Sequence, residues 1–402
     1  MTATNPRGRE QHHAVLVDPV CASERGHNLP LLLDCRDFLA KELGIETEVH
    51  VSDSLPPDVC ERTGVHATFP FAYAHEDQLR KNMGLTHVRS RGNVRQRLAK
   101  RFSFLMADLG AAHIIFPYAD YFGVLACRDA LRVVEEPSRV RISLRFIGVM
   151  ENAAPAGVPA AESLAEAVSD LRGRGVLLTL AAESAPYAAV LTDRFRDFVD
   201  VVAPLAPTWV RRGCLPTQAD RVPFAYCPGT GRGDKGFILL PEVVSRYRRL
   251  YPSSPLEFVC QAPGASRDND LHNAQVRLQA LPGVTVLPSM VSADHMAQLY
   301  GDCAFVLLPY DPSTYRLRSS ASLADAIGAE APVVTLSGTG LEAVVSYYGL
   351  GAVAPDVESL VSACHDVMLR PRSSWARSCR SALRRYDRDT VVAWRDWLGK
   401  GQ

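Results

Sequence analysis

The sequence predicts an α/β protein of two domains, each built on a parallel sheet with helices on both faces. Short apolar runs of the strand type alternate with longer segments in which apolar residues recur every three or four positions. Such alternation is typical of parallel sheets, because each crossover between parallel strands needs a helix. A proline-rich break after Val202 interrupts the pattern, which restarts at Val222. We therefore expect a first domain over residues 1–204, a linker over 205–220 and a second domain over 221–386.

Composition and charge narrow the classes of function. The chain has 402 residues, of which 47% are hydrophobic and 22% are charged, a balance typical of a soluble globular protein. Lysine plus arginine equals aspartate plus glutamate at 44 each, so no overall field favours nucleic acid as a partner. An anionic ligand must instead be held by a local cluster of cations. No apolar run approaches the ~20 residues that span a bilayer, so we expect no transmembrane segment.

The cysteines and the first residues indicate a cytoplasmic protein. Ten cysteines are scattered along the chain without a C-x-x-C motif, and several lie within predicted strands or helices. They are typical of reduced core residues and predict neither a zinc site nor a disulfide framework. Residues 1–13 are polar and lack the apolar core of a signal peptide. We expect a monomer or a homodimer.

The first domain opens with a strand, a helix and a second strand. These elements are expected at Ala14–Val17, Leu31–Leu39 and Thr47–Val51. The turn over residues 18–28 therefore lies at the carboxyl end of the first strand, where α/β sheets bind ligands. Gly26 and His27 in this turn are candidate site residues. The competing interpretation is an ordinary loop in which Asn28 caps the helix.

Polar residues follow the later strands of this domain. Asp120 comes after the strand at His113–Phe116, and Glu151 comes after the strand at Arg141–Val149. With His27 they are the candidate catalytic residues, because a carboxylate or an imidazole at such a strand end can act as a general base. Helix caps and first turns also favour acids at these places, so a structural role is the alternative for each carboxylate.

A basic segment precedes the strand that is expected to begin at His113. Residues 79–101 carry eight lysines and arginines, with few aromatic residues and no evident apolar face. A solvated surface is the first interpretation of this segment. Contact with an acidic acceptor or with an anionic membrane surface is the alternative, so peripheral membrane contact stays open.

The second domain begins with a glycine-rich turn between a strand and a helix. The strand at Val222–Cys227 leads into Pro-Gly-Thr-Gly-Arg-Gly-Asp-Lys-Gly, and helical spacing begins at Phe237. Glycines let a backbone approach a ligand closely, and the first N–H groups of a helix can donate to an anion. The turn is therefore a candidate site for a diphosphate. A plain connection between strand and helix is the alternative, because the turn has neither the Walker A order nor the G-x-G-x-x-G order.

Two cations in this turn favour the diphosphate site over a plain connection. Arg232 can grip a phosphate with two parallel hydrogen bonds, and Lys235 acts as a point charge. We expect both side chains on an exposed turn rather than in a core. Asp234 lies between them in the sequence, and we expect this carboxylate to have no favourable role beside a diphosphate.

A second stretch, over residues 305–336, again has a strand followed by a loop and a helix. An apolar strand leads into a polar loop, then an alanine-rich helix, then a second strand at Pro332–Leu336. At these residues the chain resembles the C-terminal half of GT-B glycosyltransferases, especially those with the glycosyl transferase group 1 pattern. The matching parts are Arg232 with Lys235-Gly236, and Asp325-Ala326 through Ala331-Pro332-Val333-Val334. The resemblance covers the C-terminal half, and it extends to the N-terminal half only by architecture.

The resemblance implies a GT-B fold, in which two Rossmann-like domains face each other across a cleft. The C-terminal helix, over residues 387–402, then crosses back to the first domain. It also implies a set of donor-binding residues: Gly26, Gly231, Arg232, Lys235, Gly236, Met290, Val291, Asp311, Tyr315, Arg318, Ser319, Ser320 and Asp325. The alternative for the loop from Tyr310 to Ser322 is a solvated loop in which Ser319 and Ser320 are helix caps.

The chain also departs from the pattern. The family has two acidic residues eight positions apart, but Leu317 occupies the first position and Asp325, not glutamate, the second. The missing carboxylate makes a second hypothesis necessary, a non-catalytic GT-B partner of a true transferase. A nucleotide-sugar epimerase of the same fold is a third.

The leading hypothesis is a glycosyltransferase that moves a sugar from a nucleotide-sugar to a small-molecule or glycan acceptor. The cations of the turn would neutralise the leaving diphosphate, so we expect no metal ion and no other cofactor. UDP or GDP is the expected nucleotide. Retention of configuration is slightly favoured, because a retaining reaction needs fewer protein groups and the usual glutamate pair is absent.

Overall fold

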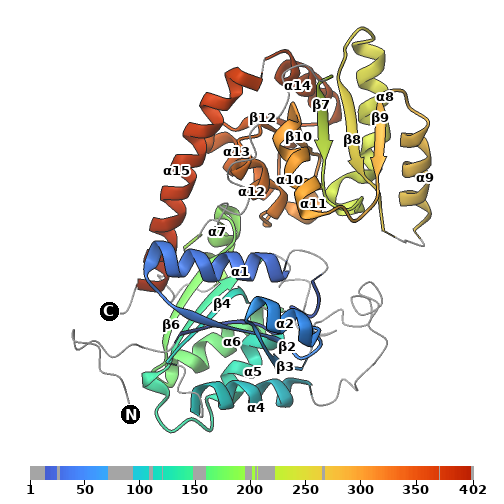
Figure 1. The fold of residues 1–402 in the computed structure, drawn as a ribbon. Helices are drawn as coiled ribbons and strands as arrows, with labels where there is room; N and C mark the ends of the chain where they lie inside the picture. The colour runs from blue at the N-terminus through green and yellow to red at the C-terminus, as the bar shows by residue number, and fades with distance from the viewer. Residues whose placement is uncertain are drawn as a thin grey trace. The chain divides into compact units, whose positions relative to one another are not determined.

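The computed structural model describes most of the chain. The described residues are 14–24, 28–70, 94–107, 112–119, 121–147, 160–194, 202–203, 206, 222–264, 268–370 and 372–399. The chain divides into two compact units (Figure 1). The first comprises Met1–Glu183, Ala188–Pro204 and Ala393–Gln402, and the second comprises Ser184–Tyr187 and Leu205–Val392. Of the expected linker, only residue 206 lies within the described residues.

The first unit is built on a parallel sheet, as the sequence predicts. Its strands are β1 (Ala14–Asp18), β2 (Thr47–Ser52), β3 (His66–Phe69), β4 (His113–Ala119), β5 (Arg141–Phe146) and β6 (Leu177–Ala182). In the described part of the chain they form a six-stranded sheet in the order β3-β2-β1-β4-β5-β6. Each neighbouring pair is parallel. The order reverses between β1 and β4, which is the Rossmann-like topology.

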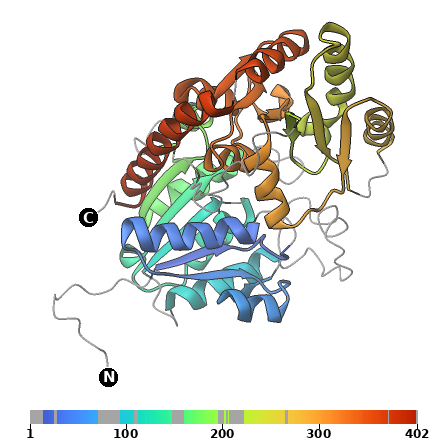
Figure 2. The same ribbon diagram turned by 45° about the horizontal axis from the view of Figure 1, so that its top comes forward.

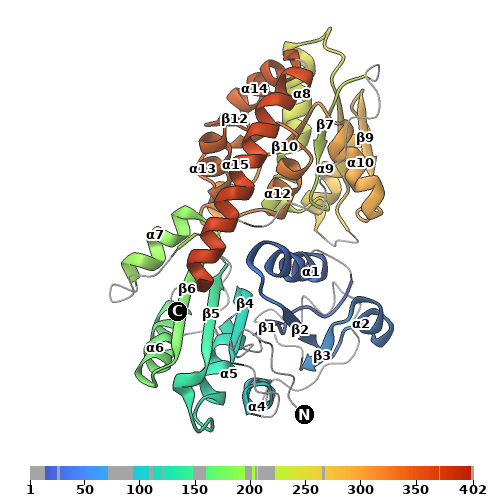
Figure 3. The ribbon, with the colours of Figure 1, turned by 60° about the vertical axis from the view of Figure 1, so that its left-hand side comes forward.

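Helices cover both faces of this sheet. They are α1 (Asn28–Phe38), α2 (Pro57–Thr63), α4 (Val94–Ala107), α5 (Tyr121–Ala130), α6 (Ala160–Gly173) and α7 (Ala185–Arg194). Helix α1 lies against the sheet (Figure 2), and α4, α5 and α6 lie on the opposite face (Figure 3). This division follows from right-handed crossovers, because the chain leaves β1 in one direction and β4 in the other.

Helix α4 corrects one expectation about the basic segment. We expected no apolar face there, but Leu98, Phe102 and Leu105 are fully buried. They recur at four- and three-residue steps and so share one side of the helix. The described end of the basic segment is therefore an amphipathic helix.

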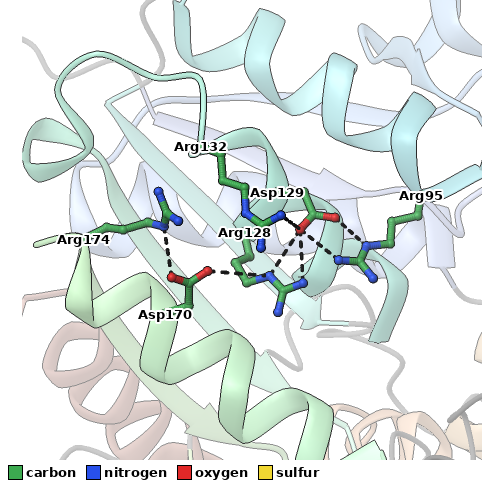
Figure 4. A network of polar contacts seen from close by, with 6 residues as sticks. All are labelled: Arg95, Arg128, Asp129, Arg132, Asp170 and Arg174. Carbon is green, nitrogen blue, oxygen red and sulfur yellow. Dashed lines mark hydrogen bonds and ion pairs between the residues drawn. The ribbon is translucent and has the colours of Figure 1, made fainter.

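Ion pairs between arginines and aspartates join α4, α5 and α6 (Figure 4). We call the residues drawn there, Arg95, Arg128, Asp129, Arg132, Asp170 and Arg174, the Arg–Asp network. Arg95 grips Asp129 with two hydrogen bonds of 2.5 and 2.9 Å, and Arg128 donates to the same carboxylate at 3.1 Å. Arg174 pairs with Asp170 at 3.2 Å. Burial raises the pKa of Asp129, but the bonds from Arg95 and Arg128 outweigh it and leave that pKa lowered.

Asp129→Asn should destabilise the first unit by about 1.5 kcal/mol at neutral pH, because charged hydrogen bonds of this kind contribute about that much. The lowered folded pKa means that the contribution is present above the unfolded pKa of about 3.9 and is lost as pH falls through the folded value. Denaturant unfolding from neutral to acid pH measures it. Glu166→Gln is the control, since Glu166 is exposed on α6 and forms no ion pair with a described residue. An equal effect of the two changes would show that the network contributes nothing.

The second unit repeats the same topology. Its strands are β7 (Phe224–Cys227), β8 (Glu257–Gln261), β9 (Val284–Leu287), β10 (Phe305–Leu308), β11 (Val333–Leu336) and β12 (Gly351–Ala354). The described strands form a six-stranded sheet in the order β12-β11-β10-β7-β8-β9, with parallel pairs throughout. Two parallel α/β sheets confirm the predicted fold class.

The helices of the second unit form an apolar core on each face of its sheet. They are α8 (Leu240–Leu250), α9 (Asn269–Gln279), α10 (Ala293–Asp302), α11 (Pro312–Tyr315), α12 (Ala321–Gly328), α13 (Gly340–Tyr348), α14 (Val357–Leu369) and α15 (Arg372–Gly399). Phe305 and Leu307 of β10 belong to one core, and Val306 and Leu308 belong to the other. This alternation explains why β10 is a continuous apolar run, since both faces of a central parallel strand are covered.

The last helix contributes to both units. It was expected over residues 387–402, but α15 already begins at Arg372. Its end from Ala393 onward belongs to the first unit, where the ring of Trp394 lies 5.5 Å from that of Phe38. Trp394 and Trp397 are both buried. None of the described helices is long and apolar enough to cross a membrane.

Candidate functional site

The glycine loop, residues 228–236, follows the first strand of the second sheet. That strand, β7, has β10 on one side and β8 on the other, so the strand order reverses beside it. In open α/β sheets, ligands bind at the carboxyl ends of strands at this reversal. The loop therefore occupies the position where the fold predicts a ligand.

The backbone of the glycine loop is strained, and hydrogen bonds to a neighbouring side chain hold it in place. Three consecutive residues have positive φ angles, namely Gly229 at 116°, Thr230 at 57° and Gly231 at 58°. A β-branched residue such as threonine rarely adopts this conformation, and such strain persists only where its surroundings fix it. Here the buried side chain of Gln261 accepts hydrogen bonds from the N–H groups of Gly229 at 2.8 Å and Thr230 at 3.5 Å.

Two glycines are required by close contacts on either side of the loop. A Cβ atom on Gly231 would lie 2.1 Å from the backbone nitrogen of Pro263, which follows β8. A Cβ atom on Gly236 would lie 1.8 Å from the carbonyl oxygen of Pro309, which follows β10. The loop thus packs tightly between the turns that follow β8 and β10. Any side chain at Gly231 or Gly236 would displace it.

Lys235 is buried beneath this loop, although we expected it on an exposed turn. Only 8% of the residue is exposed, and its ammonium nitrogen lies 5.5 Å from the centre of the Tyr310 ring. A Cβ atom on Gly229 would lie 3.4 Å from that nitrogen, so the cation sits beside the strained turn. Within the described residues, no carboxylate pairs with it. A buried charge without a counter-charge is unfavourable, and this one lies where an anion would compensate it.

Arg232 is more exposed and already paired. Its side chain is 49% exposed, and it donates to both oxygens of Asp234, from Nε at 2.9 Å and from Nη2. Burial lowers the pKa of Arg232, but the charge and the hydrogen bonds of Asp234 contribute to a net rise. The carboxylate of Asp234 thus orients the guanidinium and, among the described residues, leaves Nη1 for another acceptor. That Asp234 has no favourable role beside a bound diphosphate stays a prediction.

Arg318 brings a second cation to the same carboxylate. Its Nη1 lies 4.0 Å from Oδ2 of Asp234, and its guanidinium lies 5.6 Å from the centre of the Tyr315 ring. The side chain is 15% exposed, and its buried Nε has no hydrogen-bond partner among the described residues. An unpaired buried donor costs free energy, so an acceptor in this region would stabilise the arrangement. We call Arg232, Asp234, Lys235 and Arg318 the cation cluster.

The start of the following helix differs from the prediction. The backbone makes two 3₁₀ turns, over Gly233–Lys235 and Phe237–Leu239, before α8 begins at Leu240. The N–H of Gly236 donates to the carbonyl of Gly233, so the expectation of free helix donors near Gly236 is wrong. In the described part of the chain, the N–H groups of residues 231–234 have no protein acceptor, and they are the donors left for an anion.

Asp311 and Tyr315 have structural partners of their own. Asp311 caps α11, where it accepts from the N–H of Ser313 at 3.0 Å and from the hydroxyl of Thr314 at 2.9 Å. Hydrogen bonds from Ser313 lower the pKa of Asp311. Tyr315 is buried, which raises the pKa of its hydroxyl, and its ring lies 4.5 Å from that of Tyr310. Contact of these two residues with sugar hydroxyls stays a prediction.

The other predicted donor residues lie on neighbouring turns and helices. Ser320 caps α12 through the N–H of Leu323, and its hydroxyl donates to that of Tyr310 at 3.3 Å. Ser319 precedes this cap, and Asp325 is half-buried within α12. Met290 is exposed and Val291 half-buried in the turn after β9, which is an edge strand two places from β7. The structure thus pairs Arg232 and Arg318 with Asp234, which precedes Lys235 in the glycine loop, whereas Met290 and Val291 lie on the turn after the edge strand β9.

The predicted catalytic residues lie outside the described residues. This holds for His27, Asp120 and Glu151, and also for Gly26 of the donor set. The first sheet does present one carboxylate that sequence reasoning did not select. Asp18 is buried at the end of β1, which raises its pKa to about 6, and it accepts from the N–H of Val20 at 2.9 Å and from Asn28 at 3.3 Å. Its only sequence signal is a polar residue that ends an apolar strand.

Sequence reasoning also missed two residues that shape the loop, Gln261 and Tyr310. Both end or follow strands that flank β7, and neither has a charge or a motif that would mark it. Their importance follows only from the strand order. The described residues contain no group of three or more histidine, cysteine or acidic side chains that could hold a metal ion.

The cation cluster predicts how the protein responds to loss of its carboxylate. Asp234→Asn should bind inorganic pyrophosphate about tenfold more tightly at low salt, because a negative charge that competes for Arg232 and Arg318 is removed. Calorimetric titration measures the affinity, and added salt should shrink the difference. Glu242→Gln is the matched control, since Glu242 pairs with Arg246 on the exposed side of α8. Unchanged or weaker binding by Asp234→Asn would contradict the arrangement.

Comparison with known proteins supports the fold. No protein-family model matches the sequence, and neither does any curated protein sequence. Solved structures match over the whole length. A glycosyltransferase from Rickettsia africae has a TM-score of 0.66 at 11% identity, over 98% of this chain and 100% of that one. HepE from Anabaena, in complex with UDP and glucose, has 0.62 at 13% identity, over 97% and 98%.

A third similar structure has a different assignment. A protein from Listeria monocytogenes assigned as a UDP-N-acetylglucosamine 2-epimerase has a TM-score of 0.60 at 9% identity, over 98% of each chain. At these identities the likeness concerns the fold. The chain therefore has the GT-B fold of glycosyltransferases, as the resemblance implied.

Proposed function

We propose that the protein is a glycosyltransferase that moves a sugar from a nucleotide-sugar donor to a small-molecule or glycan acceptor. One observation carries this proposal, the largely buried Lys235 beside the strained glycine loop, whose ammonium has no carboxylate partner among the described residues. A bound diphosphate would supply the missing counter-charge. The GT-B fold, shared with HepE in its complex with UDP and glucose, supports a nucleotide as a ligand.

The chemistry follows from the charge that develops on the leaving group. As the bond between the sugar and the diphosphate breaks, negative charge grows on the phosphate oxygens. Lys235, the free Nη1 of Arg232 and the N–H groups of residues 231–234 would stabilise this charge more in the transition state than in the bound donor. Arg318 adds a third cation close to Asp234. We therefore propose that these groups do the work that a metal ion does elsewhere, and that the reaction is metal-independent.

The proposal extends to the nucleotide, the stereochemistry and the cellular location. UDP or GDP is the proposed nucleotide, and Met290 and Val291 are proposed to lie near its base. Retention of configuration is proposed, since a retaining reaction needs fewer protein groups. The described cysteines are all free thiols, which supports a reducing, cytoplasmic location.

Two alternatives have an observation in their favour. Leu317, which is buried where the resembled family has a carboxylate, favours a non-catalytic partner of a transferase. The Listeria structure favours a nucleotide-sugar epimerase, because it shares the fold. Transfer to an acceptor, formation of an epimer and absence of any product distinguish the three.

A nucleotide screen tests the proposal directly. Thermal unfolding in the presence of UDP, GDP, ADP or dTDP should show a rise in melting temperature with one of them, because a ligand at a hundred times its Kd adds about 2.7 kcal/mol of stability. The matching nucleotide-sugar should then be turned over with EDTA present, at a rate close to that without it. Strict dependence on magnesium or manganese would refute metal independence. No shift with any nucleotide would refute the donor site itself.

A further inference from the structure

The outward side of α4 carries a stripe of cations around an aromatic ring. Arg97, Lys100, Arg101 and Phe104 follow each other at three-, one- and three-residue steps, so they share one side of the helix. Lys100 and Arg101 are exposed, Arg97 is half-buried, and Phe104 is 40% exposed. The opposite side is the buried row of apolar residues described above. We call these four residues the α4 stripe.

The stripe lacks counter-charges. The sequence of α4, VRQRLAKRFSFLMA, contains no acidic residue. Among the described residues, none of Arg97, Lys100 and Arg101 forms an ion pair. Arg95 on the same helix behaves differently, because it faces α5 and belongs to the Arg–Asp network (Figure 4). The network thus fixes the helix through paired charges, and the stripe presents unpaired ones to solvent.

We infer that the α4 stripe is a docking surface for an anionic lipid membrane. Lysine and arginine near an anionic leaflet each gain about fivefold in partition, so three together would give about a hundredfold. An exposed aromatic ring among them suits the boundary between headgroups and acyl chains. Long cationic side chains can meanwhile reach the lipid phosphates beside the ring.

The shape and the overall charge favour a membrane over other anionic partners. Proteins that bind single-stranded nucleic acid use a positively charged groove that follows the backbone, whereas the stripe is the convex side of one helix. The chain has equal numbers of cationic and acidic residues, so its overall charge does not favour a long polyanion. A planar surface of anionic headgroups matches a short, convex and rigid stripe.

Sedimentation with lipid vesicles tests the inference without reference to the proposed enzyme activity. The wild-type protein should sediment with vesicles that contain phosphatidylglycerol and stay in solution with vesicles of phosphatidylcholine alone. The triple variant Arg97→Gln/Lys100→Gln/Arg101→Gln should bind about a hundredfold more weakly. Phe104→Ala should show a smaller loss. High salt should release the wild-type protein, because exposed charges are screened.

A matched control removes the same charge elsewhere. Arg249, Arg277 and Arg377 are exposed on three different helices and form no ion pair with a described residue. Their triple change to glutamine should leave vesicle binding unchanged, and thermal unfolding should show both triple variants folded. The inference is overturned if the stripe variant binds like wild type, if the control loses as much, or if the protein binds a single-stranded oligonucleotide but not the vesicles.

Discussion

The cationic side chain of Lys235, in a largely buried residue, is the feature on which the second unit's site depends. It lies under a loop whose glycines cannot be replaced without collision, and beside a turn in which threonine adopts a positive φ angle. The neighbouring cations, Arg232 and Arg318, share the single carboxylate of Asp234, and no described carboxylate pairs with Lys235. The cluster therefore holds more positive than negative charge in a partly desolvated place. Such an excess is unfavourable in the free protein and becomes favourable when a diphosphate enters.

The sequence was sufficient for the fold because the fold depends on periodicity. Apolar runs such as Phe305–Leu308 predict central strands, and the strand–loop–helix order around residue 228 places the glycine loop at a strand end. Arg232 and Lys235 could be selected as candidates from the sequence, since glycines and cations are direct sequence signals. The GT-B resemblance then rested on a few residues of the second half, and similar solved structures bear out the fold.

Side-chain partners were not predictable in the same way. The burial of Lys235 depends on Tyr310, which lies 75 positions further along the chain and reaches the loop only because β10 pairs with β7. The pairing of Asp234 with Arg232 depends on the 3₁₀ turn that replaces the expected helix start. The amphipathic face of α4 was missed because it was sought over the whole basic segment, of which the structure describes residues 94–101. In each case a tertiary contact or an element boundary decided the outcome.

The most direct test of the account is one substitution measured in two ways. Lys235→Met keeps the length of the side chain and removes its charge. Ligand-free Lys235→Met should be more stable than wild type, because a cation without a carboxylate partner among the described residues is lost, and it should bind the nucleoside diphosphate about tenfold to a hundredfold more weakly. Arg249→Met, on the exposed side of α8, should change neither quantity. A Lys235→Met protein that loses stability, or that keeps wild-type affinity, would contradict the account.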